Sequence, residues 1–128
     1  MSEKKLLRPT DSELAILNVL WKRGSSTVRE VHQDLRPVSP IGYTTVLKLM
    51  QIMTEKGLVV RDESERAHVY TARLTEQKTQ RQLVNDLLDR AFGGSATRLV
   101  MQALAGKRAS ASDLAEIRQL LDEMEATK

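Results

Sequence analysis

Hydrogen-bonding side chains gather on one side of a helix that the sequence predicts at residues 43–56. Apolar residues of this segment recur at steps of three and four, which is the spacing of one buried helical face. The residues of the segment that we assign to DNA contact are Tyr43, Thr44, Thr45, Lys48 and Gln51. Such groups on a helix can contact base edges and thymine methyl groups in the major groove of DNA. A plain solvated face has a similar composition, so the neighbouring elements must decide between the two interpretations.

A second set of basic residues falls on a ribbon predicted directly after this helix. Gly57 ends the helix, and residues 58–61 and 67–71 alternate as two strands around a polar tip. Arg61 and Arg66 stand where a guanidinium group can contact phosphate, which positions a protein on DNA without reading its sequence. A solvated loop is the alternative interpretation, because carboxylates occupy the same tip.

Catalysis and metal binding are disfavoured by the residue types that the chain contains. There is no cysteine, and His32 and His68 are the only histidines, so the spacing of a histidine metal site does not occur. Carboxylates such as Glu63 and Glu65 stand in charged runs without the partners that acid–base or nucleophilic chemistry requires. We therefore predict that the protein is not an enzyme and uses no metal or other cofactor.

Size and composition fit a small domain with a helical appendage. The 128 residues are 41% hydrophobic and 29% charged, with a net charge of +3. All of this excess lies in residues 1–74, but it is too small to establish a nucleic-acid partner by itself. No segment has the roughly 18 apolar residues of a membrane span, and the first residues lack an apolar signal region. We predict a cytoplasmic protein without membrane insertion.

The elements that must position the polar helix are marked by capping signals. Thr10 with Glu13, and Thr27 with Glu30, each have the spacing of a capping box at the start of a helix. Two such helices, the polar helix and a hairpin follow one another in that order. This order is typical of a helix-turn-helix with a wing, which we predict over residues 8–74.

The rest of the chain, residues 75–126, is predicted to be a helical dimerisation domain. Three amphipathic helices are expected there, and so small a unit cannot bury their apolar stripes alone. A second copy of the chain is the expected partner. The residues assigned to dimerisation are Leu83, Leu87, Leu88, Phe92, Leu99, Ile117 and Leu121. The predicted fold class is therefore mainly α with a small β-ribbon.

The order of these segments resembles that of the penicillinase-repressor family of bacterial winged-helix regulators, the BlaI/MecI type. The resemblance extends from about Leu7 to Met124. It is carried by SELAILNVLW, TVREVHQDL, YTTVLKLM, EKGLVVR, RAHVY, FGGS and DLAEIRQLLDE. Each segment alone is weak, whereas their order along the chain is specific.

The resemblance implies a homodimeric transcriptional repressor that covers the promoter of its own operon and of neighbouring genes. A two-fold dimer predicts a palindromic operator in double-stranded DNA. By matching positions, Tyr43, Thr44, Thr45 and Lys48 fall in the DNA-reading segment of the family, and Arg66 falls in its wing. At position 52 the family often has a basic residue, whereas this chain has isoleucine.

The resemblance also implies a route of release from DNA. Similar proteins that control β-lactamase genes are released when a membrane-bound sensor metalloprotease causes a cut in the helix after the GGS turn. Gln102 and Ala103 occupy the matching place, where well-known members have Asn-Phe. The copper-responsive branch carries a cysteine cluster that this chain lacks, so copper sensing is disfavoured. A ligand-gated repressor without cleavage and a winged-helix module that binds a protein partner are the alternatives.

Overall fold

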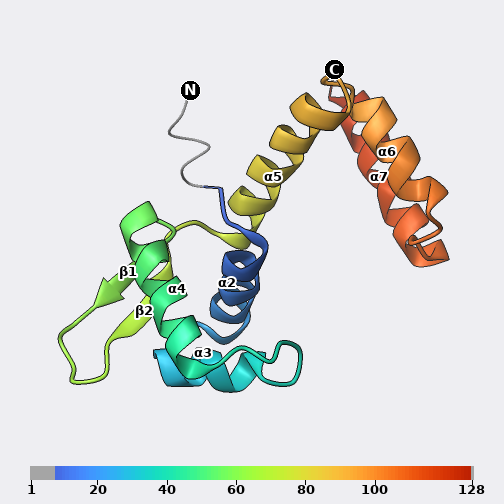
Figure 1. Cartoon of the computed structure of the whole chain (residues 1–128). Helices are drawn as coiled ribbons and strands as arrows, with labels where there is room; N and C mark the ends of the chain where they lie inside the picture. Colours follow the sequence, from blue (N-terminus) through green and yellow to red (C-terminus); the bar gives the residue numbers. More distant parts are fainter. Residues whose placement is uncertain (1–7, 128) are drawn as a thin grey trace. The chain divides into compact units, whose positions relative to one another are not determined.

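The computed structural model describes residues 8–127, which form two compact units (Figure 1). The first unit ends at Leu83 and the second begins at Val84, so the division falls within helix α5, Glu76–Ala91. The first unit contains helices and a two-stranded antiparallel ribbon, and the second is entirely helical. The predicted fold class, mainly α with a small β-ribbon, is confirmed.

Both predicted capping boxes are present in the first unit. At the start of α2, Asp11–Arg23, the Thr10 hydroxyl accepts a hydrogen bond from the Glu13 N–H, and the Glu13 carboxylate accepts one from the Thr10 N–H. Thr27 and Glu30 form the same pair at the start of α3, Val28–Leu35. These reciprocal bonds satisfy N–H groups that have no partner within the helix.

Helix α4, Tyr43–Lys56, ends as the sequence predicts, but the strands begin later than expected. Gly57 adopts a left-handed conformation with φ of 81°, which glycine tolerates without steric cost. The Leu58 N–H then donates to the Met53 carbonyl at 2.9 Å. The first strand therefore begins at Val59, although the Leu58 carbonyl still accepts a hydrogen bond from the Arg73 N–H at 2.9 Å and extends the pairing of the ribbon by one step.

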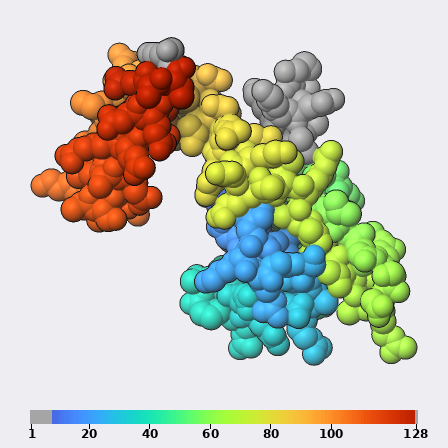
Figure 2. Space-filling view, turned by 180° about the vertical axis from the view of Figure 1, so that it is seen from behind, coloured from blue at the N-terminus to red at the C-terminus, as the bar shows by residue number. Residues whose placement is uncertain are grey.

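The ribbon pairs β1, Val59–Asp62, with β2, Val69–Ala72, in an antiparallel register. The prediction had started the second strand at Ala67, whereas Ala67 and the residue after it belong to the loop at the tip. The Ser26 and Tyr70 backbones exchange two hydrogen bonds, so the segment before α3 pairs with β2 through a single antiparallel bridge. The loop projects from the rest of the first unit (Figure 2).

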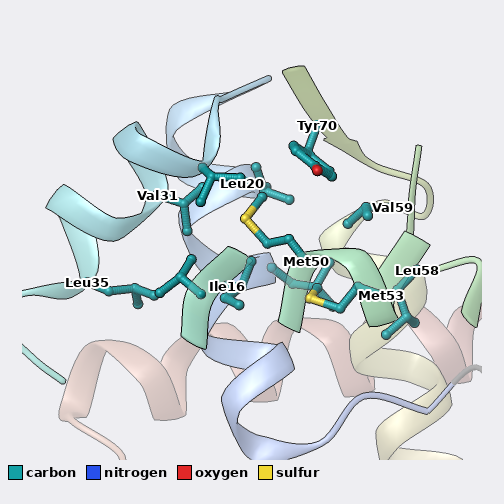
Figure 3. Packing of buried hydrophobic residues seen from close by; sticks show 12 residues of the cluster. Ile16, Leu20, Val31, Leu35, Met50, Met53, Leu58, Val59 and Tyr70 are labelled. Carbon is teal, nitrogen blue, oxygen red and sulfur yellow. The ribbon is translucent and has the colours of Figure 1, made fainter. Parts of the chain in front are cut away.

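A single apolar core holds these elements together (Figure 3). Helix α4 contributes Val46, Met50 and Met53, and none of these side chains is exposed. They meet side chains from α2, α3 and the ribbon, including that of Tyr70. The Trp21 indole N–H donates to the Leu74 carbonyl at 3.0 Å, which ties α2 to the segment after the ribbon.

The second unit leaves much of its apolar surface exposed. Helices α6, Ala96–Ala105, and α7, Ala111–Ala126, lie side by side (Figure 1), and neither contains a buried residue. The large exposed apolar side chains of this unit are Val84, Leu87, Val100, Met101, Leu114, Leu120, Leu121 and Met124. Within residues 8–127, no helix has the length and apolar character needed to cross a membrane.

Candidate nucleic-acid interface

Helix α4 presents the predicted polar residues on one exposed side. Thr44, Thr45, Lys48 and Gln51 are all exposed, and Tyr43 at the start of the helix is 46% exposed. The apolar residues of the same helix point the other way, into the core. The structure therefore brings these five side chains together on a surface that a macromolecule can approach.

The start of α4 is held by packing against α3. The rings of His32 and Tyr43 meet edge to face, with centroids 5.9 Å apart and an interplanar angle of 89°, which is a favourable aromatic geometry. The preceding Gly42 supplies no side-chain cap, in contrast to the threonine caps of α2 and α3. An aromatic contact thus fixes the end of the helix that carries Tyr43, Thr44 and Thr45.

The other end of α4 is held by an ion pair that the sequence analysis missed. The Lys56 ammonium lies 2.6 Å from Glu13 Oε1, and the Glu13 side chain is only 3% exposed. The same carboxylate caps α2, so it links the start of α2 to the last turn of α4. No local signal could have found this pair, because its members are 43 positions apart.

The two lysines of α4 therefore differ in their surroundings. Lys48 is exposed, whereas the Lys56 ammonium forms an ion pair with the buried Glu13 carboxylate. A buried carboxylate requires a partner, because transfer of an unpaired charge out of water is costly. We assign Lys56 to the orientation of α4 and Lys48 to its free surface.

The wing places its two arginines in different settings. Arg61 lies on β1 with its Nη2 2.7 Å from the Glu63 carboxylate. A hydrogen bond to the Tyr70 side chain and the charge of Glu63 raise the pKa of Arg61. Arg66 is exposed in the tip and forms no ion pair within residues 8–127.

The tip of the wing is shaped by its own acidic residues. The Ser64 N–H donates to the Asp62 carboxylate at 2.9 Å, and this bond lowers the pKa of Asp62. Glu63 and Glu65 are both exposed beside it. The wing thus offers phosphate one exposed arginine among several carboxylates.

One further exposed cation lies beside the start of α4. Arg36 caps the end of α3 and begins the loop that leads into α4. Its side chain is exposed and has no ion-pair partner in the part of the chain that the structure describes. The sequence analysis did not include Arg36 among the candidate contacts, although its position shortly before the predicted polar helix could have pointed to it.

The residues assigned to dimerisation and to cleavage all lie outside this surface. Leu87 and Leu121 are exposed, and the other predicted interface residues, Leu83, Leu88, Phe92, Leu99 and Ile117, are partly buried in the single chain. Gln102 and Ala103 are exposed in the last turns of α6.

The fold and the exposed polar helix define a winged helix-turn-helix module. The chain belongs to the penicillinase-repressor family, because the family model described as "Penicillinase repressor" matches residues 9–123. This is a family of transcriptional repressors and not of enzymes.

Similar proteins include two curated repressors. The chain is 26% identical over 120 residues to the penicillinase repressor of Bacillus licheniformis, covering 94% of each chain. It is 31% identical over 123 residues to the transcriptional regulator BlaI of Mycobacterium tuberculosis, covering 95% of this chain and 88% of that protein. The solution structure of the DNA-binding domain of the repressor BlaI matches with a TM-score of 0.50 and 27% identity, over 56% of this chain and 87% of that one.

The different settings of the two lysines predict different effects on stability. Lys56→Ala should lower the free energy of unfolding by about 1–3 kcal/mol, because it leaves the Glu13 carboxylate buried without its cation. Lys48→Ala makes the same change on the exposed side of the same helix and should stay within about 0.5 kcal/mol of the parent. Urea denaturation followed by circular dichroism measures both. Equal losses would contradict the assignment.

Proposed function

We propose that this chain represses transcription by binding an operator in double-stranded DNA through α4 and the wing. The observation that carries the proposal is the division of α4 into a buried apolar side and an exposed polar side. A helix of this kind fits the major groove of B-DNA, and a following ribbon can reach the backbone. A repressor acts where the chromosome lies, which in a bacterium is the cytoplasm.

The exposed side chains of α4 suggest how bases are read. Lys48 can donate to guanine acceptors, Gln51 can pair with adenine, and the methyl groups of Thr44 and Thr45 can contact thymine. We place the Tyr43 hydroxyl and the Arg66 guanidinium at phosphates, where they set the register of the protein on the duplex. Arg61 has the same role once its present partner is displaced.

We further propose that the protein is a homodimer held by its second unit. Leu120 and Met124 are spaced four apart on α7, and Leu114 and Leu121 seven apart, so each pair shares a helix face. Together with the exposed side chains of α5 and α6 they favour burial against a second copy. A two-fold dimer would match a palindromic operator with half-sites one helical turn apart, or a multiple of it.

Release by proteolysis is proposed at the bond between Gln102 and Ala103. Both residues are exposed on α6, and a cut there would separate α7 from the rest of the second unit. A membrane-bound sensor metalloprotease is the proposed trigger. The bond lies within a helix, so α6 must open locally before a protease can extend the backbone across its active site. The alternative is a ligand that weakens the dimer without cleavage.

If α4 reads the operator, removal of the Lys48 side chain should lower the affinity of the protein for that DNA. Lys48→Ala should weaken binding to DNA from upstream of the chain's own gene by about 1–3 kcal/mol if this lysine contacts a base. A gel-shift titration at two salt concentrations, with random DNA as competitor, measures the loss. Equal weakening on both DNAs would place Lys48 at phosphate only. Absence of salt-dependent binding by the parent would favour the protein-contact module.

If the second unit holds the dimer together, a charged side chain introduced into that unit should lower the molecular mass of the protein in solution. Leu87→Asp should shift the protein from dimer toward monomer, because an aspartate must lose its hydration to enter an apolar interface. Val38→Asp introduces the same group at an exposed apolar position of the first unit and should leave the dimer intact. Sedimentation equilibrium measures both variants. A parent protein that sediments as a monomer at all concentrations would reject the dimer.

The two release mechanisms predict different products in cells. Cleavage predicts a fragment that ends at Gln102 after the cells meet a β-lactam, and its mass spectrum would identify the cut. An untreated culture serves as the control. Intact protein in treated cells whose promoter has become active would favour the ligand-gated alternative.

A further inference from the structure

An ion pair within the wing conflicts with the use of both wing arginines as phosphate ligands. The Arg61 Nη2 and Glu63 Oε2 atoms are 2.7 Å apart, and the Glu63 side chain is 54% exposed. A carboxylate so close to a guanidinium occupies the donor that a DNA phosphate would use. Arg61 is therefore already occupied in the free protein.

The position of Arg61 on β1 limits the directions in which its side chain can extend. Residues on a strand alternate between its faces, so Arg61 shares a face with Val59, which is buried in the core. Its cross-strand partner is Tyr70, which is also buried. The Arg61 side chain is 31% exposed and lies on the core-facing side of the ribbon.

The present partners leave the guanidinium incompletely satisfied. The Arg61 Nε atom is buried and lacks a hydrogen-bond partner among the described residues. A phosphate group offers several acceptor oxygens, and arginine commonly binds such groups through two parallel N–H donors. Exchange of the Glu63 carboxylate for a phosphate would therefore give Arg61 a bidentate partner in place of a single ion-pair contact.

We propose that Glu63 is an internal substitute for DNA phosphate, which holds Arg61 in the free protein and must be displaced when the wing reaches the backbone. The inference rests on the proposed DNA binding and adds to it the residue that limits affinity at the wing. Its chemical partner is the phosphodiester backbone of DNA, independent of base sequence. Glu63 therefore lowers specific and nonspecific binding alike.

The neighbouring carboxylates provide the comparison that the test needs. Asp62 is engaged with the Ser64 N–H and supports the shape of the tip. Glu65 is exposed in the same loop and forms no ion pair within residues 8–127. Glu65→Gln therefore removes one negative charge from the tip without freeing an arginine, and Glu63→Gln removes one charge and frees Arg61.

The experiment is fluorescence anisotropy of the full chain on a labelled random-sequence duplex, at two salt concentrations. Glu63→Gln should bind about two- to fivefold more tightly than Glu65→Gln, which corresponds to the strength of an exposed ion pair. Arg61→Gln should weaken binding and reduce the slope of log affinity against log salt by about 0.9 per protomer. With Arg61→Gln present, Glu63→Gln should gain no more than Glu65→Gln.

The outcomes separate this proposal from the proposed function. Equal gains for the two glutamine variants, or a Glu63→Gln gain that persists without Arg61, would reject the masking role while leaving DNA binding intact. No binding by any variant on this duplex or on DNA from upstream of the gene would reject both. The unfolding midpoints of Glu63→Gln and Glu65→Gln should match that of the parent, because both glutamates are exposed.

Discussion

The first unit depends on one constraint, which is that α4 must bury one side and expose the other. Its buried methionines and Val46 meet three other elements, so the core cannot form unless α4 lies at the centre of the unit. The exposed side is then fixed in direction, since a helix is rigid over this length. An aromatic contact at Tyr43 and the Lys56 to Glu13 ion pair hold its two ends. A stable core and a defined exposed surface on α4 are thus two consequences of the same packing.

Ion pairs in the first unit hold part of its positive charge. Arg23 is paired with Glu30 and Asp34, Lys56 with Glu13, and Arg61 with Glu63. Exposed cations such as Arg36, Lys48 and Arg66 form no ion pair within residues 8–127, and association with phosphate depends strongly on the number of such cations. With a net charge of only +3, the proposed repressor would need specificity from base contacts and affinity from two linked copies. This need connects the proposed recognition surface to the proposed dimer.

The second unit forms capped helices with exposed apolar sides, which is the basis for proposing that it associates with a second copy. Its helices are well capped, with Ser95 and Ser110 each accepting an N–H bond in the first turn, but they bury no residue in α6 or α7. Capping marks where these helices begin, but packing of an apolar side supplies most of the stability of short helices, which is why we propose that a second copy covers these surfaces. If DNA affinity requires two linked copies, any event that opens this unit weakens binding without altering α4. A cut within α6 would be one such event.

The sequence by itself determined the local structure and much of the candidate surface. Capping boxes, the left-handed Gly57 and the spacing of apolar residues act within a few positions, so they predicted the helices and the exposed polar side of α4. Tertiary structure alone decided which lysine of α4 is free and which buried side chain lies opposite Arg61. The Lys56 to Glu13 pair spans 43 positions, and Arg61 is paired with Tyr70 across the ribbon. These features depend on the three-dimensional arrangement of groups, which residue type and spacing do not specify.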